Sequence, residues 1–244
     1  MTDIHCHILP GVDDGSPDLQ NSMLMAAMAV DDGVRAIIAT PHFSFGSEYA
    51  EEWLRDLRAA YERLRASICE ADMPLALFLG AEVLCTPDTI KLLKHGLFPT
   101  MNGTEFSLVE FYFDAQEKEM NRHLEEILAY GITPIIAHPE RFDAVQRNKT
   151  LPGQWRRMGC LLQVNKGSLY GQFGRRAQKS AKRLLDERLA SFVATDAHDV
   201  VIRTTLLRAA REKLVTTYGE KYANTLLEEM PQKLLGECAQ IEAE

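Results

Sequence analysis

The sequence predicts an α/β fold, a parallel barrel or a closely related layered fold, built from seven strand–helix units. Two patterns carry this prediction. Short apolar runs bounded by turn residues alternate with longer segments whose apolar residues recur at helical spacing. Polar residues follow most of the apolar runs, as they do at the carboxyl ends of the strands in parallel barrels. Because no linker or shift in composition divides residues 1–244, we expect a single domain.

The expected elements follow one another in regular order. The apolar runs predicted as strands are residues 3–7, 35–40, 75–79, 106–109, 132–137, 161–165 and 191–195. Apolar stripes between them predict helices, the longest of which carries Leu54, Leu57, Tyr61, Leu64 and Ile68. From about residue 203 onward the pattern predicts two helices, the first of them buried through Leu207, Ala210 and Leu214.

The chain opens on a short run of metal-binding residue types, Asp3-Ile4-His5-Cys6-His7, followed by the turn residues of Asp13-Asp14-Gly15. In a regular strand Asp3, His5 and His7 share one face, so the two imidazoles could hold one metal ion. Histidine together with carboxylate suits Zn, Mn or Fe better than Ca or Mg. An isolated H-x-H pair would equally fit a hydrogen-bonded core histidine, so the recurrence of such residues downstream decides between the two.

Histidines and acids do recur at or just after the other predicted strands, and barrels assemble their active sites on that face. The sequence therefore predicts a metal site. The candidate ligands are His5, His7, Asp14, His42, Glu82, Glu110, His138, Asp196 and His198. The other two histidines, His95 and His123, fall in helix or turn segments, where we expect solvated surface residues.

Composition narrows the classes of function. The net charge of -8 argues against binding to a nucleic-acid backbone. The first residues lack the pattern of a signal peptide, and no apolar run reaches the roughly 18 residues that a membrane span needs. The five cysteines are scattered without a C-x-x-C motif, which indicates reduced thiols. These features are typical of a cytoplasmic enzyme.

Four short motifs, taken in order, resemble the PHP superfamily, named for polymerase and histidinol phosphatase. They are D-I-H-C-H at residues 3–7, T-P-H at 40–42, A-H-P-E-R at 137–141 and T-D-A-H at 195–198. The opening I-L-P-G-V-D-D-G is similar to one branch in particular, the bacterial manganese-dependent protein-tyrosine phosphatases of the CpsB and YwqE type. That branch is associated with capsular and exopolysaccharide synthesis. The resemblance extends from residue 3 to about residue 203.

The resemblance implies a distorted seven-stranded α/β barrel that holds three metal ions through the nine candidate ligands named above. The implied metal is Mn²⁺, although Fe, Co or Zn would satisfy the same ligands. Either Asp13 or Asp14 could supply the turn ligand. Arg141 and Arg203 match the family's phosphate-contacting pair, and the implied substrate is a phosphotyrosine protein, in particular a bacterial tyrosine kinase. One departure is a less polar lip at residues 80–85, which together with residues 43–49 bears on peptide selectivity.

Charge arithmetic favours a phosphoester substrate. Four ligand carboxylates against three divalent ions leave a surplus of about two positive charges, and the two arginines add to the attraction for a phosphate dianion. Divalent metals can lower the pKa of bound water toward about 7, so a metal-activated hydroxide is the expected nucleophile, acting in line without a phosphoenzyme. A phenolate leaving group, with a pKa of about 10 as a free phenol, needs little help from a general acid. We therefore assign no general acid.

Two alternatives remain open from the sequence. The first is a small-molecule phosphatase on the same fold, acting on histidinol phosphate or a nucleotide phosphoester. The second is a non-catalytic metal-binding module, which an incomplete ligand set would indicate, whereas all nine positions are filled here. A nucleotide-binding protein is disfavoured, since the chain contains neither G-x-x-x-x-G-K-S/T nor G-x-G-x-x-G.

The cysteines generate a first testable prediction. Cysteine-dependent tyrosine phosphatases need an arginine six residues after the nucleophile, and none of Cys6, Cys69, Cys85, Cys160 or Cys238 has one. We expect each Cys→Ser variant to keep most of its phosphatase activity, while a chelator removes activity and Mn²⁺ restores it. Loss of turnover in a single variant with unchanged metal content would contradict a metal-dependent mechanism.

Overall fold

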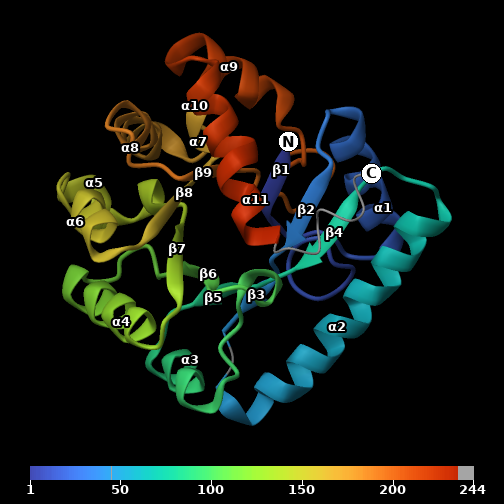
Figure 1. Cartoon of the computed structure of the whole chain (residues 1–244), viewed down its shortest axis with the longest axis horizontal. Helices are drawn as coiled ribbons and strands as arrows, with labels where there is room; N and C mark the ends of the chain where they lie inside the picture. Colours follow the sequence, from blue (N-terminus) through green and yellow to red (C-terminus); the bar gives the residue numbers. More distant parts are fainter. Residues whose placement is uncertain (45, 236–244) are drawn as a thin grey trace.

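The computed structural model describes residues 1–44 and 46–235, and its strands are all parallel (Figure 1). One sheet has the order β1-β2-β4, and the other has the order β3-β5-β6-β7-β8-β9. The strands are β1 (Thr2–Cys6), β2 (Ala36–Ala39), β3 (His42–Phe43), β4 (Ala76–Leu79), β5 (Glu82–Leu84), β6 (Phe106–Glu110), β7 (Thr133–Ala137), β8 (Leu161–Asn165) and β9 (Phe192–Ala194).

Two of the seven strand positions are interrupted, which is why nine strands form where seven were expected. β2 and β3 are separated by Thr40 and Pro41, and Pro41 has no N–H with which to continue the ladder. β4 and β5 are likewise separated by Gly80 and Ala81. Backbone bonds from Gly80 N to Ala39 O (2.8 Å) and from Glu82 N to Pro41 O (3.0 Å) keep the two interrupted strands side by side. Residues 82–84 therefore continue the barrel wall as β5.

The two sheets close into one barrel because β1 pairs with the segment that follows β9. Cys6 forms a parallel bridge with Ala197. His5 O accepts a bond from Asp196 N (2.8 Å), and Ala197 O accepts one from His7 N (2.8 Å). The closed order is β1, β2/β3, β4/β5, β6, β7, β8, β9, with seven positions. The predicted seven-stranded parallel α/β barrel is therefore confirmed.

Strand β1 contains a bulge that decides where its side chains point. Asp3 pairs with Ile37 and Cys6 with Ala39, so two residues on β1, Ile4 and His5, oppose the single residue Ile38 on β2. The extra residue breaks the regular alternation. Asp3 and Cys6 consequently face the surrounding helices, while Ile4 and His5 both face the barrel interior. The prediction that Asp3 shares a face with His5 and His7 is wrong for this reason, whereas the prediction that Cys6 is a small core residue is confirmed.

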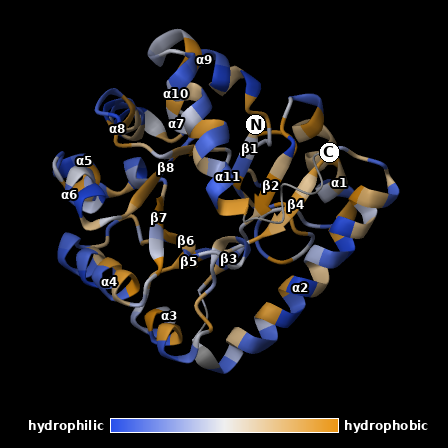
Figure 2. Cartoon of the chain, in the orientation of Figure 1, coloured by the Kyte–Doolittle hydropathy of each residue, from blue (hydrophilic) through white to orange (hydrophobic). Residues whose placement is uncertain are grey.

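The apolar core has two parts. Inside the barrel, one buried cluster takes residues from β1, β2, β6, β7 and β9, including Ile4, Ile38, Leu108, Ile135 and Phe192. A larger cluster lies between the strands and the helices, and Figure 2 shows the apolar colour concentrated on the strands and on the inward faces of the helices. Leu234 and Leu235 of the last described helix join the interior cluster. That helix therefore closes one end of the barrel, and the polar site occupies the other.

Helices surround the barrel, with α2 lying along one side and α11 in contact with β1 (Figure 1). The longer ones are α1 (Leu19–Asp31), α2 (Ser47–Glu70), α4 (Glu117–Ala129), α6 (Leu151–Met158), α8 (Gly174–Asp186) and α9 (Arg208–Tyr218). The shorter ones are α3 (Pro87–Lys91), α5 (Asp143–Arg147), α7 (Lys166–Leu169), α10 (Glu220–Asn224), the π-helical turn η4 (Thr225–Glu229) and α11 (Met230–Leu235), with 3₁₀ turns η1 (Leu92–His95), η2 (Met101–Gly103) and η3 (Pro139–Arg141). The two C-terminal helices predicted from the sequence correspond to α9 and to the stretch from α10 to α11. In the described part of the chain no helix is both long and apolar enough to cross a membrane.

The seam between β1 and β9 generates a second prediction. The buried Asp3 carboxylate accepts bonds from Thr195 N (3.0 Å) and Thr195 Oγ1 (2.5 Å). Thr195→Val would leave one buried carboxylate oxygen without its donor, so we expect a loss of about 1–3 kcal/mol in the free energy of unfolding. Denaturant titration measures the loss, and Thr195→Ser, which keeps the hydroxyl, should recover most of it. Equal stability of the valine variant and the parent would contradict this account of the seam.

Candidate metal centre

Nine side chains meet at the carboxyl ends of the strands, and they are the nine that the sequence predicts as ligands. Most of the ligands form three groups, and within each group the candidate ligand atoms all lie within 4.8 Å of one another. They are His7, Asp14, His42 and His198; His5, His7, Glu82 and Asp196; and His42, Glu82 and Glu110. The groups overlap through His7, His42 and Glu82. His138 adjoins them through a contact of 2.7 Å between its Nε2 and Glu82 Oε1.

Residues around the cluster fix the orientation of the histidines. His5 Nδ1 lies 2.9 Å from Gln163 Oε1, and His7 Nδ1 lies 2.7 Å from Asp13 Oδ2. Both rings are thus held from behind and turn their Nε2 atoms inward. Such an arrangement, with one ring nitrogen hydrogen-bonded and the other directed at the site, is typical of metal-binding histidines. Gly15 makes the second contact possible, because a Cβ there would lie 2.2 Å from His7 O.

The inward-facing atoms have too few hydrogen-bond donors for the number of acceptors. The Nε2 atoms of His5 and His7 are 3.2 Å apart, and each lies 3.2–3.5 Å from Glu82 Oε2 and Asp196 Oδ1. Among the described residues, Glu82 Oε2, His138 Nδ1 and His198 Nε2 are buried without a hydrogen-bond partner. Buried polar atoms are otherwise paired, and a divalent cation would pair several of these at once. The donor set therefore fits metal ions.

Electrostatics keep the buried carboxylates ionised. Burial alone would raise the pKa of Glu82 and of Asp196, but the neighbouring His5 charge and contacts with other histidines hold both well below their usual range. Burial would lower the pKa of His7, whereas its bonds to Asp13, Asp196 and Glu82 raise it well above its usual value. For His198, burial and the charges of His7 and Arg203 lower the pKa to about 4, so this imidazole is neutral near pH 7.

Two of the nine residues have left-handed backbone conformations. His138 follows Ala137, an interior residue of β7, so regular alternation would turn it outward. Its φ of 34° takes the chain out of the strand and brings the ring against Glu82. Asp196 has φ of 53°. Non-glycine residues in this region are strained, and such strain is concentrated at functional sites.

Both predicted arginines lie at the mouth of the cluster, beside the same carboxylate. Arg203 Nη2 lies 2.6 Å from Asp196 Oδ1, and Arg141 Nη1 lies 3.5 Å from Asp196 Oδ2. The Arg141 guanidinium is held between two rings, 4.4 Å from the centroid of Phe113 and 4.4 Å from that of Phe173. Their side chains are 20% and 26% exposed, so both can reach a ligand that enters from solvent.

Comparison with known proteins identifies the family. Residues 1–236 match the family model for capsular polysaccharide synthesis, CpsB/CapC. The chain belongs to this family. It is 34% identical to tyrosine-protein phosphatase YwqE of Bacillus subtilis over 93% of this chain and 89% of that protein. It is 32% identical to tyrosine-protein phosphatase CpsB of Streptococcus agalactiae over 96% of this chain and 98% of that protein.

A solved structure supports the same assignment. It comes from crystal structures of YwqE from Bacillus subtilis and CpsB from Streptococcus pneumoniae, described as unique metal-dependent tyrosine phosphatases. It superposes on this chain with a TM-score of 0.85 at 33% identity and covers 96% of this chain and 94% of that chain. The resemblance to the CpsB and YwqE branch, which the opening I-L-P-G-V-D-D-G predicted, is therefore confirmed.

Several residues of the site were missed at the sequence level. Gln163 Nε2 donates to Asn165 Oδ1 (2.8 Å), and Asn165 Nδ2 donates to Asp196 Oδ2 (2.5 Å), so a chain of amides links His5 to Asp196. The sequence signal for these two residues was their spacing, since two polar residues two positions apart in an otherwise apolar strand face the same side. Glu140, also missed, is buried and accepts bonds from Ser168 Oγ (2.6 Å) and Asn165 N (3.0 Å).

The structure also shows where Asp13, Asp14, His95 and His123 lie relative to the cluster. Asp13 holds the back of His7, while Asp14 Oδ1 lies 3.5 Å from the Nε2 atoms of both His42 and His198. His95 is exposed, as expected. The prediction for His123 is wrong, because this ring is buried on α4, parallel to Phe111. An apolar helix face can bury an imidazole, and helical context alone did not indicate which face it lay on.

A third prediction concerns the proposed ligands. We expect His42→Ala, Glu110→Ala and His138→Ala each to weaken metal binding at least about tenfold, since each removes a donor from a shared cluster. His95→Ala should keep its full metal content. Metal bound per chain after dialysis is the measurement, and a full complement in His138→Ala would contradict its assignment. His123→Ala is a second control, in which unfolding is expected at lower denaturant with metal content unchanged.

Proposed function

We propose that this chain is a metal-dependent phosphatase that hydrolyses phosphotyrosine in proteins. The observation that carries the proposal is the cluster of three overlapping histidine–carboxylate groups with two arginines at its mouth. Membership of the CpsB/CapC family, together with the names of its relatives, supports the reaction class. The nine residues His5, His7, Asp14, His42, Glu82, Glu110, His138, Asp196 and His198 are the proposed ligands of Mn²⁺ ions, three in number.

The metal ions supply Lewis acidity and lower the pKa of bound water. The protein's own residues do the rest. Gln163 and Asp13 hold His5 and His7 in the orientation that presents Nε2 to the site. Arg141 and Arg203 bind the non-bridging oxygens of the phosphoryl group, since a guanidinium can donate two parallel bonds to a phosphate. A phenolate leaves readily, so the reaction needs little help from a general acid.

Exposed apolar side chains around the mouth favour a polypeptide over a small molecule. Tyr112 and Phe113 follow β6, and Val201 and Ile202 follow His198, all of them exposed. These loops leave the carboxyl ends of their strands, as the cluster does. Exposed apolar residues gathered around a site are a common feature of protein-binding surfaces. We therefore rank a phosphotyrosine protein above histidinol phosphate or a nucleotide as the substrate.

The proposed partner is a bacterial tyrosine kinase, and the proposed location is the cytoplasm. Both proposals rest on the family's association with capsular polysaccharide synthesis. The cysteines among the described residues are free, as expected in a reducing compartment, and Cys238 lies outside the described residues. A direct test compares turnover of a phosphotyrosyl peptide with that of histidinol phosphate, together with metal analysis of the purified protein. Faster hydrolysis of histidinol phosphate would favour the small-molecule alternative.

A fourth prediction tests the arginine pair. Arg141→Ala and Arg203→Ala should keep their metal content and lose about ten- to a hundredfold in kcat/KM, because each loses a charge-assisted contact of roughly 1.5–3 kcal/mol. Lysine at either position should restore part of the loss, since it keeps the charge but not the planar fork. Inorganic phosphate should also inhibit both alanine variants more weakly. Unchanged turnover and unchanged phosphate inhibition would mean that the arginines are structural.

A further inference from the structure

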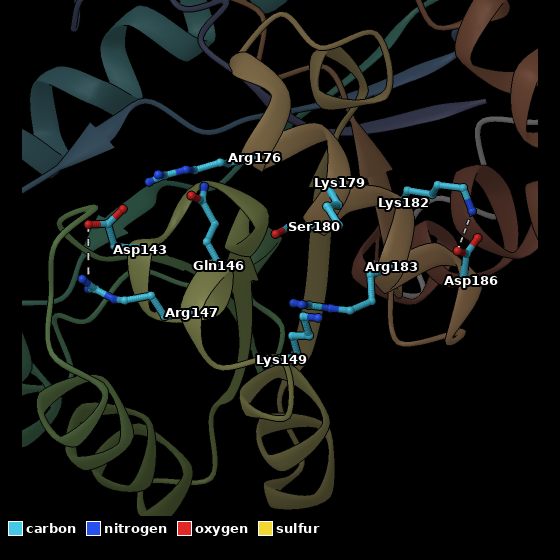
Figure 3. A pocket seen from close by; sticks show the side chains of 10 residues that line it. All are labelled: Asp143, Gln146, Arg147, Lys149, Arg176, Lys179, Ser180, Lys182, Arg183 and Asp186. Atoms are coloured by element: carbon cyan, nitrogen blue, oxygen red, sulfur yellow. Dashed lines mark hydrogen bonds and ion pairs between the residues drawn. The ribbon is translucent and has the colours of Figure 1, made fainter.

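A basic groove lies between helices α5 and α8, outside the metal cluster (Figure 3). Its volume is about 710 Å³. Six of the side chains that line it are cationic: Arg147, Lys149, Arg176, Lys179, Lys182 and Arg183. Only two, Asp143 and Asp186, are anionic. This concentration of positive charge is unexpected in a chain whose net charge is -8.

Most of these cations lack an acidic partner. Asp143 pairs with Arg147 (3.7 Å), and Asp186 pairs with Lys182 (2.6 Å). Within residues 1–44 and 46–235, the other four cations, Lys149, Arg176, Lys179 and Arg183, form no ion pair. Arg183 Nε is moreover buried without a hydrogen-bond partner, although Nη2 of the same side chain donates to Val145 O (3.1 Å). The groove thus has unused capacity to bind anions.

Both walls of the groove adjoin residues that hold or include the proposed phosphate-binding arginine, Arg141. Arg141 is the last residue of η3, and α5 starts two residues later at Asp143. On the other wall, Phe173 stacks on the Arg141 guanidinium at 4.4 Å and directly precedes α8. In Figure 3, Arg176 extends from α8 toward the side of α5, while Lys149 and Arg183 point toward the same part of the groove. A ligand held at Arg141 can therefore continue directly along the basic wall.

We propose that this groove binds acidic residues that flank the phosphotyrosine of the substrate protein. The proposal rests on the phosphatase function proposed above and adds a preference for acidic sequence around the phosphorylated tyrosine. Arg183 lies nine positions beyond the first residue of α8, a rise of about 14 Å along the helix. An extended peptide spans that distance in about four residues. The preferred acids should thus lie within about two to five positions of the phosphotyrosine.

The concave shape favours a peptide over a lipid surface. A bilayer presents a broad plane of headgroups and would contact cations on protruding faces, whereas Lys149 and Arg183 point toward one another within a groove between two helices. Gln146 and Ser180 also line the groove and offer hydrogen bonds suited to a peptide backbone. The carboxylates of Asp143 and Asp186 would repel acidic side chains of the peptide on either side of the four unpaired cations. This repulsion would favour one register of the peptide in the groove.

The test compares two phosphotyrosyl peptides that differ only in charge, one with Asp and Glu flanking the tyrosine and one with Asn and Gln in their place. The double variant Arg176→Glu/Lys179→Glu reverses two exposed groove charges. Arg58→Glu/Lys118→Glu, on α2 and α4, makes the same change in net charge elsewhere on the surface. We expect the groove variant to lose about tenfold in kcat/KM on the acidic peptide, through KM and more strongly at low salt. Its hydrolysis of the neutral peptide and of free phosphotyrosine should be unchanged.

Direct binding separates this proposal from the phosphatase function. Fluorescence anisotropy of a dye-labelled, unphosphorylated acidic peptide needs no turnover, and its binding should be weakened in the groove variant but not in the control variant. That result would support the groove even if no phosphoester were hydrolysed. Equal hydrolysis and equal binding of the acidic and neutral peptides by the parent would overturn the proposal. The proposal would also be overturned if the parent bound phosphatidylserine vesicles but not the acidic peptide, and the groove variant lost that vesicle binding.

Discussion

The structure depends on the hydrogen bonds that join β1 to the segment after β9. The donors and acceptors are the backbone groups of His5, His7, Asp196 and Ala197, so the bonds that close the barrel are made by proposed metal ligands and a neighbour. Closure brings the first motif of the chain against the last, and neither half of the cluster exists without it. The buried Asp3–Thr195 contact reinforces the same seam from the outer side. Fold and site therefore share one set of interactions.

The sequence predicted most of the architecture because two periodicities are local. Buried strands and amphipathic helices alternate along the chain, and polar residues mark the strand ends, so the seven strand positions and the clustering of all nine residues could be predicted. The predictions failed where geometry departs from regular alternation. The β1 bulge re-aims Asp3, the left-handed backbone at His138 turns its ring inward, and Pro41 and Gly80 divide two strands. None of these departures changes the local pattern of apolar residues.

The orientation of side chains around the metal cluster was harder to predict than which residues form the cluster. Gln163 and Asn165 were recognised as strand residues but not as the amides that link His5 to Asp196, because their role depends on partners far away in the sequence. The choice between Asp13 and Asp14 likewise required the fold of a turn that packs on His7 through Gly15. The buried position of His123 depended on the rotation of α4. In each case the missing information was a tertiary contact.

The seam between β1 and β9 also has a consequence for how the chain is made. About 190 residues separate Cys6 from Ala197, and synthesis at about 5–20 residues per second needs roughly 10 to 40 s to cover them. During that interval β1 has emerged without one of its two neighbours, and its edge is open to other chains. The apolar end of the barrel is then closed by α11, the last described helix, through Leu234 and Leu235. Newly made chains of this protein are therefore expected to depend on chaperones more than a fold built from local contacts would.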